Sequence, residues 1–312
     1  MKLDEHQLHQ LSIAGRTAST LSLLGVATII AGYCTSPSFR SPTHRIMLIN
    51  AVFSVFDSVA TMISVSGPAA GNESGLCRFQ AFSLQMFPLA DVLWTLAMTW
   101  DVALVVFWHY EPEALRRLEK KYFAVIMTLT FIPAAIFLFI RNDTKGPLYG
   151  SVTFWCSVSP NWVLFRLIFY YVPIWVLITI VFGLYIAITR EMFKLRHELI
   201  LIRNDCIVLN SEDSPRSASF PQTQSSQDGT ETPQAPLIRR QSVVSLRKFL
   251  IMPVMFFLAL MTTWVAPTIN RMYAFRYPGR EPYGLMLAVA ALGSLRGFWN
   301  GIIFITLRSK GR

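Results

Sequence analysis

Residues 79–109 read FQAFSLQMFPLADVLWTLAMTWDVALVVFWH, a long apolar run that contains only two carboxylates. About 20 such residues cross the hydrocarbon core of a membrane as a helix. Six further apolar stretches lie at 17–33, 46–66, 122–140, 163–189, 249–271 and 283–307. Each is expected to be helical, because irregular backbone facing lipid would leave its amides unpaired. The sequence therefore predicts an all-α membrane protein, a bundle of seven transmembrane helices.

The composition agrees with a membrane domain and with little else. Of the 312 residues, 53% are hydrophobic and 15% are charged, whereas a soluble domain carries about 25% charged residues. We expect one transmembrane domain at 17–307 and no separate soluble domain. The net charge of +10 does not indicate nucleic-acid binding, since the basic residues lie in loops, where anionic lipid and partner proteins are the expected counter-charges.

The distribution of basic residues predicts the orientation in the membrane. If residues 1–16 lie outside, the inner loops and the tail at 308–312 hold 18 of the 28 Lys and Arg residues, and the outer segments hold six. The positive-inside rule then favours an extracellular N-terminus and a cytoplasmic tail. Residues 1–16 also lack the layout of a cleaved signal, so the first helix is expected to act as an uncleaved insertion signal.

Glycosylation sequons and cysteines support the same orientation. The two Asn-x-Ser/Thr sequons begin at Asn72 and Asn142, and both fall in predicted outer loops, where glycosylation occurs. Cys77 and Cys156 face the oxidising exterior, while the other two cysteines face the cytosol. We expect a Cys77–Cys156 disulfide between the third helix and the second outer loop. Two free thiols are the alternative.

The third inner loop, at about 197–245, is expected to be disordered. Its central part, 211–241, is dominated by Ser, Gln, Pro and Thr, which provide too little apolar surface to offset the entropy of ordering. Ser242 follows Arg239-Arg240-Gln241, and Ser214 precedes Pro215, so both serines are candidate phosphorylation sites. A phosphate at Ser242 would place about two negative charges beside the two arginines.

Polar residues inside the predicted helices are candidates for a switch, because buried charges are costly and usually face the bundle interior. The candidates are Asp57, Asp91, Asp101 and Asn300. They either form a polar core with two arrangements or a static clasp between helices. Pro267 should kink the sixth helix, either as a hinge or as a fixed bend. Arg271 and Arg296 are expected to extend toward a membrane surface.

A second set of residues is predicted to line a ligand pocket in the outer half. These residues are Gln80, Arg166, Tyr170, Trp264 and Asn270. Arg166 is the leading candidate, because a cation just inside the fifth helix needs an anionic partner, a water-filled cavity or a route to the interface. The alternative for the aromatic residues is an interfacial belt.

Several motifs of catalysis and cofactor binding are missing from the sequence. The seventh stretch contains no Lys for a retinal Schiff base, and the five histidines lie in tails, loops or helix ends. There is no P-loop, GxSxG or HExxH pattern, as a nucleotide, serine-hydrolase or zinc-protease site would require. We therefore expect no enzymatic activity, no cofactor and no metal.

Short motifs occur in order along the chain: CRFQAF at 77–82, ADVLW at 90–94, WC at 155–156, YVPIW at 171–175, WVAPTINR at 264–271 and GFWN at 297–300. Together they resemble the cyclic-AMP-receptor-like G-protein-coupled receptors of fungi and slime moulds. The resemblance covers about 11–307, apart from the third inner loop. Trp100-Asp101-Val102 takes the place of an Asp-Arg-Tyr triplet at the base of the third helix.

The resemblance implies a plasma-membrane receptor that passes an extracellular signal, a nutrient or another small molecule, to a heterotrimeric G protein, with the cyclic-AMP pathway as the expected output. The G protein would bind an inner cleft lined by Arg196, Arg247 and Lys248. A transporter or channel is the alternative, with the intramembrane polar residues as its path. A third possibility is a scaffold in which the disordered loop is the working part.

Overall fold

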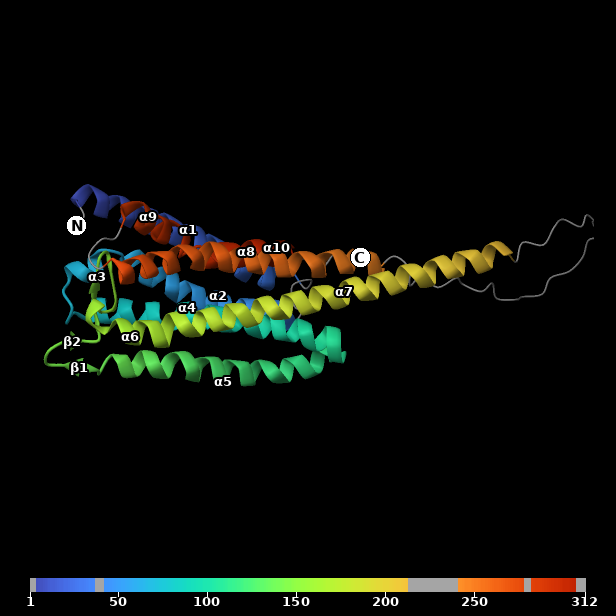
Figure 1. Cartoon of the computed structure of the whole chain (residues 1–312), viewed down its shortest axis with the longest axis horizontal. Helices are drawn as coiled ribbons and strands as arrows, with labels where there is room; N and C mark the ends of the chain where they lie inside the picture. Colours follow the sequence, from blue (N-terminus) through green and yellow to red (C-terminus); the bar gives the residue numbers. More distant parts are fainter. Residues whose placement is uncertain (1–3, 37–41, 213–240, 278–281, 307–312) are drawn as a thin grey trace, which may run out of the picture.

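In a computed structural model, the chain is described at residues 4–36, 42–212, 241–277 and 282–306. Long helices lie side by side in a bundle (Figure 1). The principal helices are α1 (Glu5–Thr35), α2 (Pro42–Ile63), α4 (Gly75–Trp108), α5 (Pro112–Phe137), α7 (Val172–Glu212), α8 (Gln241–Arg276), α9 (Tyr283–Leu292) and α10 (Arg296–Thr306).

The lengths and hydropathies of these helices fit a membrane protein. Within the described ranges, five helices are long and apolar enough to cross a membrane, and α9 with α10 makes a sixth if this pair, bent by 42°, is one span. The predicted stretch at 249–271 falls within α8. The chain is therefore mostly helical, with five or six candidate membrane-spanning helices, and seven spans remain a prediction.

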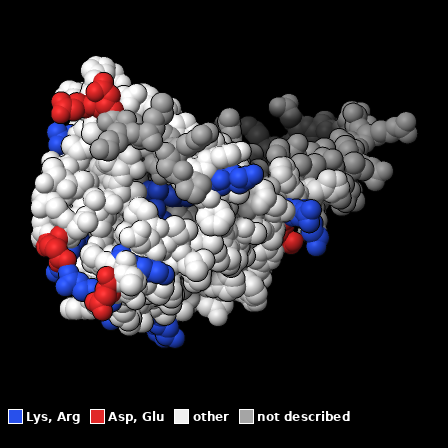
Figure 2. Space-filling model, turned by 60° about the vertical axis from the view of Figure 1, so that its left-hand side comes forward, with Lys and Arg blue, Asp and Glu red and all other residues white. Residues whose placement is uncertain are grey.

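One end of the bundle carries short elements, among them strands that the all-α prediction did not include. They are α3 (Ser66–Ala69) and two antiparallel hairpins, β1 (Arg141–Asn142) with β2 (Gly146–Pro147) and β3 (Tyr149–Val152) with β4 (Trp155–Val158). The N-terminus lies at this end, which we call the hairpin end (Figure 1). Figure 2 turns this end forward and shows acidic and basic side chains scattered over a largely uncharged surface.

The core is built around α4, which packs against α2, α5 and α7. Trp94 and Met98 of α4 are buried with Phe256 and Trp264 of α8, each with 1% or less of its surface exposed. In lipid there is no hydrophobic driving force between helices, so close van der Waals packing of this kind contributes to their association.

The helices α1 and α10 approach each other through glycines. A Cβ atom on Gly25 would lie 2.3 Å from the carbonyl oxygen of Gly297, and one on Gly301 would lie 2.8 Å from Cα of Gly25. The amide of Gly297 also donates a hydrogen bond to Ser22 Oγ, at 2.8 Å. Small residues at this interface let the two backbones touch.

Two predicted stretches differ in detail from single straight helices. The stretch at 163–189 consists of α6 (Val163–Arg166), a π-helical segment, η3 (Leu167–Tyr171), and the first part of α7. The stretch at 283–307 is broken between α9 and α10. The third loop also differs from the expected disorder at 197–245, because α7 continues to Glu212 and α8 begins at Gln241. Residues 213–240 lie outside the described residues.

Candidate ligand-binding site

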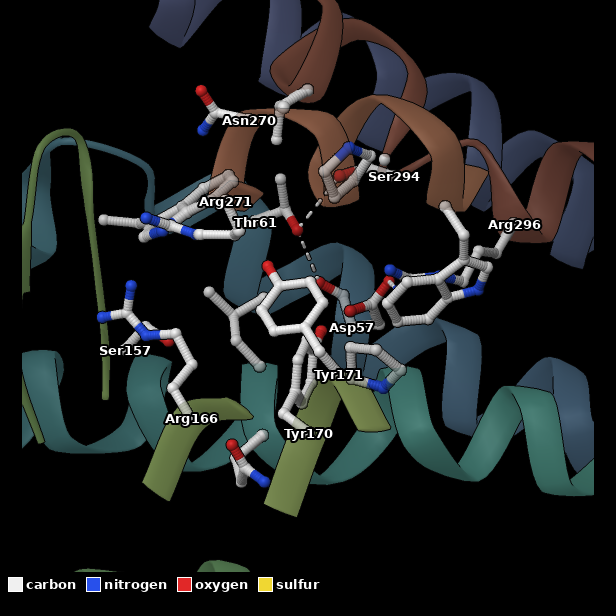
Figure 3. A pocket seen from close by; sticks show the side chains of 18 residues that line it. Asp57, Thr61, Ser157, Arg166, Tyr170, Tyr171, Asn270, Arg271, Ser294 and Arg296 are labelled. Atoms are coloured by element: carbon white, nitrogen blue, oxygen red, sulfur yellow. Dashed lines mark hydrogen bonds and ion pairs between the residues drawn. The ribbon is translucent and has the colours of Figure 1, made fainter. Parts of the chain in front are cut away.

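A cavity of about 70 Å³ lies in the hairpin-end half of the bundle (Figure 3). It is bounded by α2, α4, β4, the segment from α6 to η3, α8, α9 and the break before α10. Its lining comprises Asp57, Thr61, Leu84, Gln85, Pro88, Trp155, Ser157, Arg166, Tyr170, Tyr171, Trp264, Pro267, Asn270, Arg271, Val289, Gly293, Ser294 and Arg296.

Most of the predicted pocket residues meet in this cavity. Arg166, Tyr170, Trp264 and Asn270 all line it, although they come from helices far apart in the sequence. Gln80 does not. Its Nε2 donates to the carbonyl oxygens of residues 60 and 64, each at 3.1 Å, and its Oε1 accepts from the amide of residue 156 at 2.8 Å. Gln80 therefore connects α2, α4 and β4 outside the cavity.

The tyrosines reach the cavity because the helix there is irregular. Pro173 has no N–H, so the carbonyl four residues earlier, that of Phe169, loses its usual helical donor. Gln85 of α4 donates its Nε2 to this oxygen at 3.2 Å. The π-helical turn η3 ends at Tyr171, and such turns often occur at functional sites. Tyr170 and Tyr171 both line the cavity.

Two guanidinium groups lie toward one side of the cavity. Arg166 of α6 and Arg271 of α8 lie on the side where Ser157 of β4 is placed (Figure 3). Arg166 is 9% exposed. Because β4 belongs to the hairpin end, this is the side of the cavity nearer the molecular surface.

A buried ion pair lies on the other side. Arg296 Nη1 contacts Asp57 Oδ2 at 2.5 Å, and the two residues are 9% and 4% exposed. The expectation that Arg296 extends to a membrane surface was therefore wrong. The break before α10 turns the Arg296 side chain toward α2, which its position in the sequence does not reveal. There the carboxylate of Asp57 compensates the cost of burying the positive charge.

The ion pair is part of a connection between α2 and the helix break. Ser294 Oγ donates to Thr61 Oγ1 at 3.2 Å, and Thr61 Oγ1 donates to the carbonyl oxygen of Asp57 at 3.0 Å (Figure 3). With the Asp57–Arg296 contact, these bonds fix the break against one face of α2. A substitution of Asp57 or Arg296 would therefore change how the break between α9 and α10 packs against α2.

Trp264 joins this ion pair to the part of the cavity lining that comes from η3. Its ring lies 5.0 Å from the guanidinium carbon of Arg296 and 5.8 Å from the ring of Tyr170. A cation over an indole face is attracted by the ring quadrupole. One turn further along α8, Thr268 Oγ1 accepts a hydrogen bond from Trp175 Nε1 at 3.0 Å, which ties α8 to α7.

Several buried polar atoms around the cavity have no hydrogen-bond partner among the described residues. They are Asp57 Oδ1, Trp264 Nε1, Asn270 Oδ1 and Arg296 Nε. Leaving such groups unpaired costs about 1–3 kcal/mol each. They therefore mark the cavity as a place for water or for a polar ligand.

The other predicted switch residues form two separate clusters. Asp91 Oδ1 accepts hydrogen bonds from Asn50 Nδ2 at 2.7 Å and Asn300 Nδ2 at 3.3 Å, so this cluster joins α4 to α2 and α10. Farther along α4, Asp101 Oδ1 accepts from the hydroxyl of Tyr122 in α5, at 2.9 Å.

Near that second cluster, Arg45 of α2 contacts Glu119 of α5 at 2.9 Å. The end of the bundle opposite the hairpins is thus held by polar contacts among α2, α4 and α5. Asp101 is the middle residue of the sequence Trp100-Asp101-Val102. The hydrogen bond from the Tyr122 hydroxyl ties Asp101 to α5.

The hairpin end contains the predicted disulfide between Cys77 and Cys156, which joins α4 to β4. Tyr149 of β3 lies beneath it, 3% exposed, and donates its hydroxyl to the carbonyl oxygen of Ala134 at 3.1 Å. Burial raises the pKa of the Tyr149 hydroxyl well above its usual value, so this donor stays protonated. These contacts hold the β3–β4 hairpin over the cavity side of the bundle.

The remaining predicted sites are placed only in part. Asn72 and Asn142 lie exposed at the hairpin end, and their glycosylation remains a prediction. Ser214 lies outside the described residues. Ser242, Arg196, Arg247 and Lys248 fall within α8 or α7, but their side chains lie outside the described part of the structure.

Some cavity residues were not predicted as ligand contacts. Ser157, Thr61, Ser294 and Arg271 line it, and the first three are ordinary polar residues at positions that only the packing of helices brings together. The Gly293-Ser294 pair in the seventh apolar stretch was the one local signal of a helix break.

The fold and site define a helical membrane protein with a charged cavity enclosed near one end of its bundle. The chain belongs to the slime mold cyclic AMP receptor family, whose profile matches residues 5–200. The matched part runs from the start of α1 into α7. A comparison with curated proteins found no match. The resemblance drawn from short motifs is thus confirmed, and the chain is a receptor-like membrane protein.

Proposed function

We propose that this chain is a seven-helix receptor that passes an extracellular small-molecule signal to a heterotrimeric G protein. The observation that carries the proposal is the cavity, with arginines toward the hairpin end and the Asp57–Arg296 pair at the helix break on its far side. A molecule entering from the hairpin end would meet the arginines first. It would then reach a contact that connects α2 to α10.

The orientation in the membrane supports this direction of signalling. Both sequons and the disulfide lie at the hairpin end, and the sequence places 18 of the 28 basic residues in segments on the opposite side. We therefore place the hairpin end and residues 1–16 outside the cell, the receptor domain at 17–307 in the plasma membrane, and the tail at 308–312 inside. In this arrangement α8 supplies one of the seven spans.

The route from the cavity to the inner side runs through α8. Trp264 contacts both Arg296 and Tyr170, and Pro267, which also lines the cavity, removes one helical hydrogen bond from the same turn. A ligand that fits better when Trp264 is displaced would favour a second arrangement of α8, since a ligand shifts an equilibrium only by its difference in affinity for the two states. The G protein would then bind between the inner ends of α7 and α8.

The test is guanine-nucleotide exchange on a co-expressed G protein, measured while a panel of small extracellular metabolites, cyclic AMP included, is applied. The variant Arg247→Glu/Lys248→Glu reverses charge in the proposed inner cleft, and we expect it to abolish exchange at an unchanged surface level. Lys145→Glu, at the hairpin end, is the matched control and should leave exchange intact. Undiminished coupling in the inner double variant would reject the cleft, and no exchange with any panel member would count against the receptor proposal.

The core packing favours a receptor over a transporter or channel. Large side chains, among them Trp94, Phe256 and Phe304, fill the centre of the bundle with 1% or less of their surface exposed. A transporter needs its polar residues to open onto both sides in turn, which would require repacking of these side chains. Measurement of solute flux in proteoliposomes separates the two functions, since a receptor would carry none.

A further inference from the structure

The cavity has more positive than negative charge in its lining. Three guanidinium groups, those of Arg166, Arg271 and Arg296, share the lining with one carboxylate, that of Asp57. Removing a cation from water is costly unless a negative charge compensates it. Arg296 is 9% exposed and needs such compensation, which an occupant with an anionic group is able to supply.

The ion pair in the cavity uses only part of the bonding capacity of its two members. A guanidinium and a carboxylate can form two parallel hydrogen bonds, but only Arg296 Nη1 and Asp57 Oδ2 are paired, at 2.5 Å. Asp57 Oδ1 and Arg296 Nε have no hydrogen-bond partner among the described residues. Arg296 can therefore accept a second anionic group before its contact with Asp57 is lost.

The position of Arg296 in the fold also favours an anion. Arg296 is the first residue of α10, an 11-residue helix. The N-terminus of a helix carries a partial positive charge, so a cation placed there is unfavourable and an anion is favourable. In the structure, Asp57 of α2 supplies that negative charge. An anionic group from another source would meet the same electrostatic demand.

We propose that an anionic group of the ligand, a carboxylate or a phosphate, binds Arg296 in competition with Asp57. The exchange of partners removes the ion pair that holds α2 to the break between α9 and α10, and the Ser294–Thr61 hydrogen bond remains there. The inference rests on the proposed receptor function and specifies both the ligand's chemistry and the contact that the ligand breaks.

The geometry of the cavity suits this exchange. Arg166 and Arg271 lie toward the side of the cavity nearer the hairpins, and the Asp57–Arg296 pair lies on the other side (Figure 3). An anion that enters from the hairpin end therefore passes Arg166 and Arg271 before it reaches Arg296. Trp264 lies over Arg296 at 5.0 Å and lines the same cavity. A group that draws Arg296 away from Asp57 therefore also disturbs the ring of Trp264, which belongs to α8.

The experiment uses the purified full-length chain in detergent without a G protein. Its thermal stability is measured against increasing inorganic phosphate, with chloride added to keep the ionic strength constant. We expect wild-type protein to be stabilised by phosphate. In Asp57→Asn, the competing carboxylate is gone, so half-maximal stabilisation should need roughly tenfold less phosphate, as expected for removal of one charge-assisted contact. In Arg296→Gln, the stabilisation should disappear.

Two further variants keep the test interpretable. The double variant Asp57→Asn/Arg296→Gln removes both charges together, so it avoids an unpaired buried charge and should fold, yet it should show no response to phosphate. Glu73→Gln removes a carboxylate from a surface cluster with Arg78 and Arg141 and should respond like wild-type protein. An unchanged or weaker response in Asp57→Asn, or a retained response in the double variant, would overturn the inference.

The same variants separate this inference from the proposed function. If phosphate binding follows the expected pattern but Asp57→Asn gives no rise in ligand-free nucleotide exchange on a G protein, the anion site stands and G-protein coupling is contradicted. If exchange is observed with a panel metabolite while the phosphate pattern fails, the receptor stands and the competition with Asp57 is rejected.

Discussion

Substitution of Gly25 by Ala tests whether the contact between α1 and α10 supports the site. A Cβ atom at this position would lie 2.3 Å from the carbonyl oxygen of Gly297 and 2.7 Å from Cα of Phe298. Both are backbone atoms of α10, so no side-chain rotation relieves the overlap. The two helices must move apart, which would also lengthen the hydrogen bond from Gly297 to Ser22.

The expected magnitude follows from opposing effects. Overpacking of a tight interface costs about 1–3 kcal/mol, and loss of one hydrogen bond costs about 1 kcal/mol. Alanine in place of glycine stabilises a helix interior by about 1 kcal/mol. The net change for Gly25→Ala should therefore be a loss of about 1–3 kcal/mol in the free energy of unfolding.

The measurement is the temperature at which half of the detergent-solubilised protein no longer elutes as a monodisperse peak. Gly183→Ala in α7 is the matched control, because nothing lies within 4 Å of its added Cβ. That control should be unchanged or more stable, by up to about 1 kcal/mol. If Gly25→Ala is as stable as Gly183→Ala, the close approach of α1 and α10 is not a feature of the folded protein.

Three further substitutions test the contacts around the cavity. Cys77→Ser opens a loop of 79 residues closed by the bond to Cys156, so stability should fall by about 4 kcal/mol, and reductant should lower the melting temperature of wild-type protein but not that of the variant. Gln80→Leu leaves one backbone amide and two backbone carbonyls without their hydrogen-bond partner. At about 1–3 kcal/mol per group, the free energy of unfolding should fall by several kcal/mol, which would be measured as a lower melting temperature and poor surface expression. Trp175→Phe removes one hydrogen bond to Thr268, and a double-mutant cycle with Thr268→Val should give a coupling energy of about 0.6 kcal/mol, the average for such bonds in membranes.

Sequence reasoning located the helices because hydropathy reports directly on burial in lipid. It located most of the pocket for a related reason: a charged or amide side chain such as Arg166 or Asn270 is costly in lipid, so its presence in an apolar stretch indicates a polar cavity. Four of the five residues proposed for the pocket line it. The same reasoning also selected Gln80, but its side chain forms hydrogen bonds that join α2, α4 and β4. Hydropathy does not distinguish a residue that contacts a ligand from one that forms hydrogen bonds between structural elements.

The features that could not be predicted depend on how helices face each other. Arg296 looked like a residue that reaches the membrane surface, but the bend between α9 and α10 turns it toward Asp57. Nothing in the local sequence around either residue indicates that pairing. The hairpins of the second outer loop were missed for another reason: β3 and β4 are only four residues each, too short for an alternating pattern to be distinguished from a loop.

The irregular parts of the helices are concentrated around the cavity, and this distribution says where the protein can move. The π-helical turn before Pro173, the turn of α8 at Pro267 and the break between α9 and α10 each supply cavity residues. Sharp bends in helices occur at such interruptions, where side-chain contacts take the place of regular backbone hydrogen bonds. At the α9–α10 break those contacts are the Asp57–Arg296 pair and the Ser294–Thr61 bond. Elsewhere, the glycine contact between α1 and α10 leaves no room for small adjustments. Under the proposed function, a molecule bound in the cavity would therefore act on the interrupted parts of the helices, while the tightly packed helices on either side would preserve the rest of the structure.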